Sequence, residues 1–205
     1  MWDVGLIPDS AFKGDKPVTQ SDGAERSPMP LLPQLAALGY RPENITYIAF
    51  SHYHFDHTAN ANAFAGCTWL VHAAERDAMF AASPEHQSAY SRLRNSKTVI
   101  LPDTDYDVFG DGTVIIKYAP GHTPGHQVLA LKLPKTGPVL IAGDLWHYKE
   151  ERTASQAPQS EANRQKTMAS RAAMEAYLKK SGAQLWIEHD PETFNRLKKA
   201  PDYIE

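Results

Sequence analysis

Three histidines and an aspartate crowd into residues 51–57, which read Ser-His-Tyr-His-Phe-Asp-His. On an extended backbone His52 and His54 point the same way, because side chains alternate between the two faces of a strand. A turn after them can bring Asp56 and His57 to a second centre. Imidazole and carboxylate groups together suit zinc and other first-row transition metals. We therefore expect this stretch to hold metal.

Residues of the same chemical types follow the ends of several predicted strands. In order along the chain, the cluster follows Ile45–Phe50, His122 follows Val114–Tyr118, Asp144 follows Val139–Ala142 and His189 follows Leu185–Ile187. These runs are β-branched and apolar, as buried strands are. A strand end fixes the position of the residue after it, so such ends are good places for ligands. Together they offer five histidines and two aspartates, enough for two metal ions.

The rest of the pattern predicts a layered α/β protein. Two turns, Asp111-Gly112 and Pro134–Gly137, separate apolar runs in the way that hairpins require. Predicted helices cover Leu31–Leu38, Ala73–Phe80, Glu161–Lys180 and Pro191–Lys199, and residues 8–30 are expected to form a long loop. We expect one domain over residues 1–205.

Composition excludes several classes of protein. The chain has 205 residues, 42% hydrophobic and 22% charged, which is ordinary for a globular domain. A net charge of −3 argues against a nucleic-acid partner, which needs a basic face. No apolar run is long enough for a membrane helix and no signal peptide is visible, so we expect a cytoplasmic protein. The single cysteine, Cys67, excludes an intrachain disulfide and is expected to be a buried filler.

The ligand order resembles that of the metallo-β-lactamase superfamily. Two flanking motifs match as well, Gly-His-Thr-Pro-Gly-His at 121–126 and Ala-Gly-Asp at 142–144. The resemblance implies an αβ/βα sandwich with two divalent metal ions at one edge of its two sheets. It implies that the first metal is held by His52, His54 and His122, the second by Asp56, His57 and His189, and that Asp144 bridges them. Zinc is the metal we expect, with iron, manganese and cobalt as alternatives.

Such a centre predicts hydrolysis. Two divalent cations lower the pKa of a shared water enough to give hydroxide at neutral pH, and the cations polarise the oxygen that receives charge. Asp56 and Asp144 would contribute to catalysis by holding these ions.

The substrate is predicted by resemblance within the superfamily. True β-lactamases generally lack the bridging aspartate that Asp144 implies. The C-terminal segment is similar to that of the N-acyl-homoserine lactonase group, with His189-Asp190 followed by the lysines and the proline of 194–201. We expect a small lactone, or a related ester, as substrate. The alternatives are an organophosphate or phosphodiester hydrolase, an iron-dependent enzyme resembling sulfur dioxygenases, and a non-catalytic module.

The sequence departs from that group in two places. Many of those lactonases have a tyrosine three positions after the bridging aspartate, where this chain has His147 followed by Tyr148. Either side chain could stabilise a developing oxyanion. Family members also open with strands before the Asp-x-Gly turn, whereas only Met1 and Trp2 precede Asp3 here. We expect the sandwich to lack its first strands, and we expect a homo-oligomer because open sheet edges invite pairing.

Overall fold

The computed structural model describes residues 1–13, 18–19, 26–27, 29–81 and 87–205. These residues form two compact units: unit 1 contains 1–71 and 77–100, and unit 2 contains 72–76 and 101–205. Each unit has a hydrophobic core of its own. Among the described residues, no helix is both long enough and apolar enough to cross a membrane.

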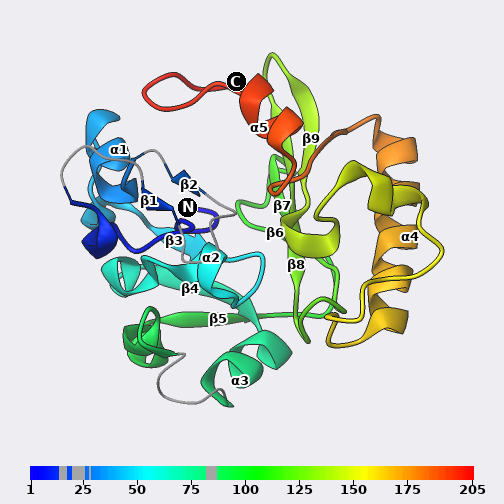
Figure 1. Cartoon of the computed structure of the whole chain (residues 1–205), viewed down its shortest axis with the longest axis horizontal. Coiled ribbons are helices and arrows are strands. Elements are labelled where there is room, and N and C mark those ends of the chain that lie inside the picture. Colours follow the sequence, from blue (N-terminus) through cyan, green and yellow to red (C-terminus); the bar gives the residue numbers. More distant parts are fainter. Residues whose placement is uncertain (14–17, 20–25, 28, 82–86) are drawn as a thin grey trace. The chain divides into compact units, whose positions relative to one another are not determined.

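Unit 1 contains the sheet β3-β4-β5, seen side by side in Figure 1. Its elements are β1 (Val18–Thr19), β2 (Arg26–Ser27), α1 (Leu31–Ala37), β3 (Tyr47–Ala49), α2 (Phe55–Thr58), β4 (Thr68–His72), α3 (Ala73–Ala81) and β5 (Thr98–Leu101), of which His72 to Arg76 and Leu101 fall in unit 2. Strands β3 and β4 are parallel, with Ile48 opposite Trp69. Both side chains are fully buried, together with Phe64 and Leu93. The predicted strand 45–50 is thus real but shorter.

The first residues of the chain pair with β3. Trp2 forms a parallel bridge with Ala49, and the Asp3 N–H donates to the Ala49 carbonyl over 3.1 Å. Cys67 is buried in the core of unit 1, as expected. The predicted loop 8–30 lies partly outside the described residues, and the part described includes a 3₁₀ turn at Asp9–Ala11 and the β1–β2 pair.

Unit 2 is built on a five-stranded sheet of order β10-β9-β8-β7-β6. The elements are β6 (Tyr106–Asp107), β7 (Val114–Tyr118), β8 (Gln127–Leu133), β9 (Gly137–Ile141), α4 (Arg164–Ser181), β10 (Gln184–Trp186) and α5 (Pro191–Arg196). The two predicted hairpins are present, since β6 pairs antiparallel with β7 and β8 pairs antiparallel with β9.

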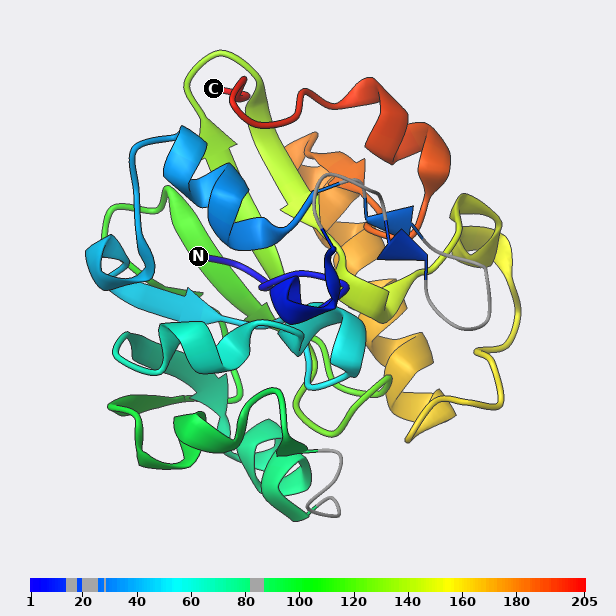
Figure 2. The same ribbon diagram turned by 60° about the vertical axis from the view of Figure 1, so that its left-hand side comes forward.

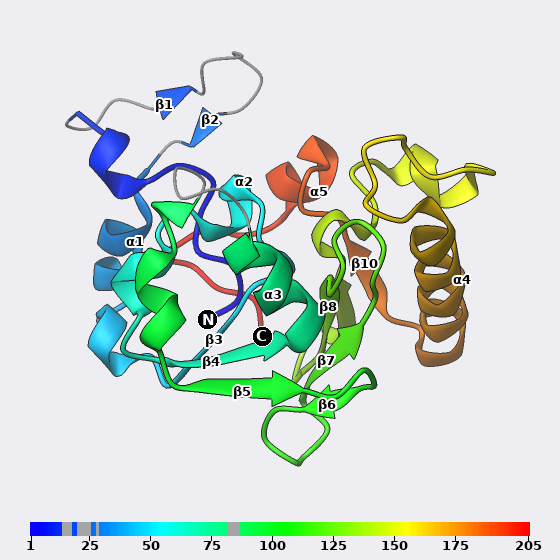
Figure 3. The same ribbon diagram turned by 90° about the horizontal axis from the view of Figure 1, so that it is seen from below.

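Helix α4 covers one face of this sheet, as Figures 1, 2 and 3 show from three directions. Met174 and Leu178 of α4 pack with Val128 and Leu140 of the strands in the core of unit 2. The helix begins three residues later than the predicted Glu161, because the Asn163 side chain accepts a hydrogen bond from the Lys166 N–H and caps it.

The strand order brings predicted ligands to one edge of the sheet. Strand β10 runs parallel to β9, with Trp186 opposite Ile141. Both strands therefore end at the same edge, and Asp144 and His189 each come three residues after this pair. Parallel neighbours thus place an aspartate and a histidine from distant parts of the sequence at one edge.

Candidate metal centre

The predicted ligands of unit 1 lie in the segment after β3 and in α2. His52 is fully buried, and its Nε2 lies 2.8 Å from Nδ1 of His54. The backbone of His54 is extended, and α2 begins directly after it. The short α2 then carries Asp56 and His57, whose Oδ2 and Nε2 are 3.6 Å apart. The cluster thus contains two close pairs of side chains, His52 with His54 and Asp56 with His57.

Ser51 and Asp3 orient the buried rings of this cluster. The Ser51 hydroxyl lies 3.0 Å from Nδ1 of His52 and 3.1 Å from Nδ1 of His57. An Asp3 carboxylate oxygen lies 2.9 Å from the same His57 Nδ1, while the other accepts from the Ser51 N–H over 2.7 Å. Because Nδ1 is used in these contacts, Nε2 is the nitrogen that His52 and His57 can offer to a cation.

In unit 2, Asp144 is the centre of a second cluster. Its carboxylate is only 5% exposed and lies next to three imidazole rings. The distances from Asp144 oxygens to Nε2 are 3.4 Å for His122, 3.2 Å for His147 and 3.1 Å for His189. Asp144 sits in a 3₁₀ turn, Gly143–Leu145, at the end of β9. The three ligands expected in this unit are therefore gathered.

The residues present fit divalent cations. Each unit brings imidazole nitrogens and carboxylate oxygens together, a donor set that suits zinc, iron or manganese. His122 and Asp144 are both buried, and a buried carboxylate is costly unless positive charge or hydrogen bonds accompany it. A cation beside Asp144 would supply that charge.

His147 belongs to the Asp144 cluster, whereas Tyr148 does not contact it in the same way. The His147 Nδ1 lies 3.6 Å from a Glu151 oxygen, and its ring stacks on His189 at 5.6 Å between centroids. Burial acts to lower the pKa of His147, but the hydrogen bond to Asp144 and the charges of Asp144 and Glu151 outweigh it and raise that pKa. Tyr148 is 56% exposed.

The turn that carries His122 is held by the carboxylate of Glu75. Gly125 N–H and the Thr123 hydroxyl donate to the buried carboxylate of Glu75, over 2.8 Å and 2.7 Å. A Cβ on Gly125 would lie 2.5 Å from the Glu75 nitrogen, so only glycine permits this approach. Such contacts fix the position of His122 by fixing its turn.

His126 is a structural residue of this turn. Its Nδ1 lies 3.0 Å from the Ala119 carbonyl, and its Nε2 accepts from the Asp144 N–H over 3.1 Å. Both ring nitrogens are thus used within the protein, and His126 holds the backbone of Asp144 in place.

Sequence reasoning missed the residues that orient the ligands. They are Asp3, Ser51, Glu75, Glu151 and Glu161. The Asp3 carboxylate could have been noticed from the Asp-x-Gly turn that it opens. Ser51 lies next to His52 in the 51–57 stretch, and Glu151 lies four positions after His147. Glu75 and Glu161 occur in no motif, and their partners lie at large sequence separations, for example 39 positions between His122 and Glu161.

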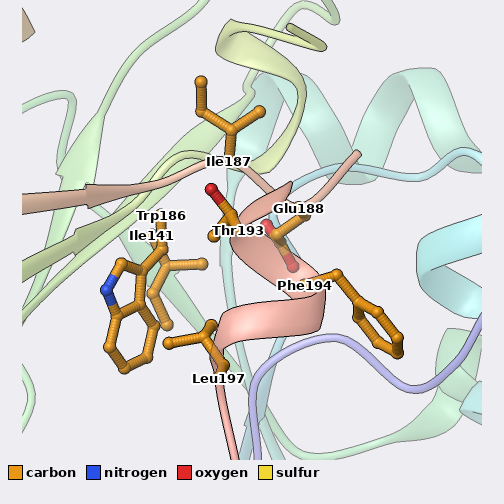
Figure 4. A pocket seen from close by; sticks show the side chains of 7 residues that line it. All are labelled: Ile141, Trp186, Ile187, Glu188, Thr193, Phe194 and Leu197. Atoms are coloured by element: carbon orange, nitrogen blue, oxygen red, sulfur yellow. The ribbon is translucent and has the colours of Figure 1, made fainter. Parts of the chain in front are cut away.

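An apolar pocket of about 290 Å³ lies beside the ligand-bearing strand ends of unit 2 (Figure 4). Its lining comes from β9, β10, α5 and the residues next to them: Ile141, Trp186, Ile187, Glu188, Thr193, Phe194 and Leu197. Figure 4 shows Ile141, Trp186 and Leu197 close together at one side, with Phe194 on the other. Glu188 immediately precedes His189, so the pocket adjoins the cluster in sequence.

Comparison with known proteins gives consistent matches. The model of the metallo-beta-lactamase superfamily matches residues 18–178. The N-acyl homoserine lactonase AttM of Azorhizobium caulinodans is 32% identical over 181 residues, covering 84% of this chain and 68% of the relative.

Solved structures agree. The crystal structure of a quorum-quenching N-acyl homoserine lactone lactonase has a TM-score of 0.81 and 27% identity, covering 99% of this chain and 79% of that one. An N-acyl homoserine lactone hydrolase with the product N-hexanoyl-L-homoserine bound at its catalytic metal center has a TM-score of 0.80 and 27% identity, covering 99% and 81%. The expected α/β fold is therefore confirmed.

Proposed function

The chain belongs to the metallo-β-lactamase superfamily and shares the hydrolase class of its relatives, and from that premise we propose that it opens the ring of N-acyl-homoserine lactones. The observation that carries the proposal is the Asp144 cluster, a buried carboxylate with three imidazole Nε2 atoms 3.1 to 3.4 Å away. It supplies the nitrogen and oxygen donors of a hydrolytic metal centre in a chain whose relative is named a lactonase.

The ligand set is part of the proposal. His52, His54, Asp56 and His57 of unit 1 and His122, Asp144 and His189 of unit 2 would hold two divalent cations, zinc before iron, manganese or cobalt. When bound, such ions supply hydroxide at neutral pH and polarise the carbonyl of the substrate. Ser51 contacts Nδ1 of His52, and Asp3 contacts Nδ1 of His57. These contacts hold the two rings and leave Nε2 of each as the nitrogen that can bind a cation.

His147 is the better placed of the two residues proposed to stabilise an oxyanion. Its Nε2 is 3.2 Å from Asp144, within the cluster, and an imidazole N–H can donate a hydrogen bond to a developing oxyanion. The exposed Tyr148 has no such position. We therefore assign the donor role to His147.

The pocket beside the cluster would take the acyl substituent. Ile141 and Trp186, which line this pocket, are paired at the ends of parallel strands and come three residues before Asp144 and His189. A lactone at the ligands could therefore extend an apolar chain into the pocket toward α5. The pocket volume of about 290 Å³ is at the small end of the usual ligand range, which suits such a chain.

A hydrolysis screen tests the function. Metal-replete protein is offered N-acyl-homoserine lactones, γ-butyrolactone, aryl esters, phosphotriesters and a cephalosporin, and ring opening is followed by proton release. We expect lactones to be turned over with the highest kcat/KM, and the metal-free protein to be inactive. Faster turnover of phosphotriesters, or no turnover of any lactone, would overturn the proposal.

A further inference from the structure

The carboxylate of Glu161 is buried against one of the proposed ligands. The side chain is 0% exposed, and its Oε1 lies 3.2 Å from Nδ1 of His122. Its other oxygen, Oε2, accepts a hydrogen bond from the Thr167 hydroxyl over 2.7 Å. A carboxylate removed from water needs such partners, because an uncompensated buried charge is expensive. Both oxygens of Glu161 are thus committed to this corner of unit 2.

The backbone around Glu161 is tied to the backbone around His122. The Ala162 N–H donates to the His122 carbonyl over 3.2 Å, and the Asn163 N–H donates to the Gly121 carbonyl over 2.8 Å. Gly121 has φ +143°, and a Cβ there would lie 2.2 Å from the Thr167 nitrogen. The start of α4 and the His122 turn therefore meet at a distance that only glycine allows. The Glu161 carboxylate is held in place before any ligand binds.

This contact decides which nitrogen of His122 is available. A neutral imidazole carries one proton, on Nδ1 or on Nε2. A carboxylate that accepts from Nδ1–H keeps the proton there and leaves the lone pair on Nε2, which is the atom 3.4 Å from Asp144. Ser51 and Asp3 do the same for the rings of unit 1, through His52 and His57.

We propose that Glu161 is the positioning residue of His122, which fixes its tautomer and ring orientation for metal binding while Thr167 holds the carboxylate. The inference rests on the proposed function, since it takes His122 to be a ligand. Outer partners of this kind typically change metal affinity by about 10- to 100-fold when they are removed. Glu161 touches no substrate, so its effect is on the affinity of one metal.

The test measures Zn²⁺ binding by competition with a chromophoric chelator for the wild type, Glu161→Gln, Glu161→Ala and Thr167→Val. We expect Glu161→Ala to weaken one of two Zn²⁺ equivalents by roughly 10- to 100-fold. Glu161→Gln should retain part of the affinity, because its amide oxygen can still accept from Nδ1–H, and Thr167→Val should fall between the wild type and Glu161→Ala. Nitrogen-15 NMR of the metal-free protein should show His122 as the Nδ1–H tautomer in the wild type and a mixture in Glu161→Ala.

Glu175→Gln is the matched control, because Glu175 lies in helix α4, has a partly exposed side chain and pairs with Arg152 rather than with a proposed ligand. It should bind both equivalents as the wild type does, and thermal melts of every variant check folding. A folded Glu161→Ala with wild-type Zn²⁺ affinity and an unchanged His122 tautomer would overturn the inference. If the wild type itself binds no Zn²⁺, the proposed function fails instead, so the two failures are distinguishable.

Discussion

At the scale of single residues, Asp144 has the strongest predicted effect. Asp144→Ala removes the carboxylate that three imidazoles surround in unit 2. Two cations repel each other, and a shared carboxylate offsets that repulsion, so at least one metal equivalent should be lost. Lactone hydrolysis should fall below detection. Metal content by mass spectrometry checks this, and a variant that keeps both equivalents and wild-type turnover would contradict the assignment of Asp144.

A pair of substitutions separates the two oxyanion-donor candidates. His147→Ala should lower kcat for lactones by roughly 10- to 1,000-fold, as the removal of such donors does. Tyr148→Phe should change kcat by less than about twofold, because the side chain is exposed and lies outside the Asp144 cluster. Steady-state kinetics at saturating metal measure both. The reverse order of effects would assign the role to Tyr148.

The ligand types were predictable from sequence, whereas the residues that orient them were not. His52, His54, Asp56 and His57 are close in sequence, and each remaining ligand follows a strand, so periodicity and strand ends were enough to propose them. The contacts of Glu161 with His122 and of Asp3 with His57 span 39 and 54 positions. Such contacts follow from tertiary packing, which no local pattern encodes.

At the scale of elements, the meeting of α4 with the His122 turn depends on Gly121. Gly121→Ala would place a Cβ 2.2 Å from the Thr167 nitrogen at a φ of +143°, so backbone must move. We expect a loss of about 2–4 kcal/mol in the free energy of unfolding, comparable with overpacking plus backbone strain. Gly66→Ala is the control, since its Cβ would meet nothing within 4 Å. Denaturant melts compare the two, and equal stabilities would contradict the packing argument.

Pocket shape should control the preference for acyl chains. Leu197→Trp fills part of the space beside Ile141 and Trp186, so KM should rise for long-chain N-acyl lactones, by about tenfold for the loss of one or two buried methylenes. Hydrolysis of γ-butyrolactone, which has no acyl chain, should be unchanged. Leu197→Ala enlarges the pocket and should favour longer chains. Identical chain-length profiles for all three proteins would place the acyl group elsewhere.

Element boundaries were predicted less well than element types. The hairpins of unit 2 were predicted because turn residues separate alternating apolar runs. Helix α4 starts at Arg164 because Asn163 caps it, although the preceding Glu161 is also a good helix former. The capping contact of Asn163 and the burial of Glu161 set the start of the helix. Helix propensity alone does not distinguish a start at Glu161 from one at Arg164.

At the scale of the whole molecule, the α/β architecture followed from the alternation of strands and helices. The two compact units did not, because they depend on which long-range contacts form. Residues 72–76 belong with 101–205 although they lie between the two segments of unit 1 in the sequence. The single domain and the homo-oligomer expected from the sequence stay predictions.

Acid stability should depend on a histidine that the proposed metal centre does not use. His72 is fully buried, its ring lies 4.4 Å from the Tyr118 ring between centroids, and its Nδ1 is 3.6 Å from an oxygen of the exposed Asp103. Burial lowers the pKa of His72, and the nearby Asp103 carboxylate offsets this only in part. The neutral ring is therefore favoured in the folded protein.

The sign of the pH dependence follows from that lowered pKa. Below the unfolded value of about 6.5, the unfolded chain binds a proton that the folded protein resists, so stability falls as the pH decreases. The full stability is present above about pH 6.5, and the loss has a slope of at most about 1.4 kcal/mol per pH unit. His72→Phe should flatten this acid limb, and Asp103→Asn should extend it to lower pH by removing the partial offset. Urea melts of metal-free protein between pH 8 and pH 5 measure both, and an acid limb in His72→Phe as steep as in the wild type would show that other groups cause it.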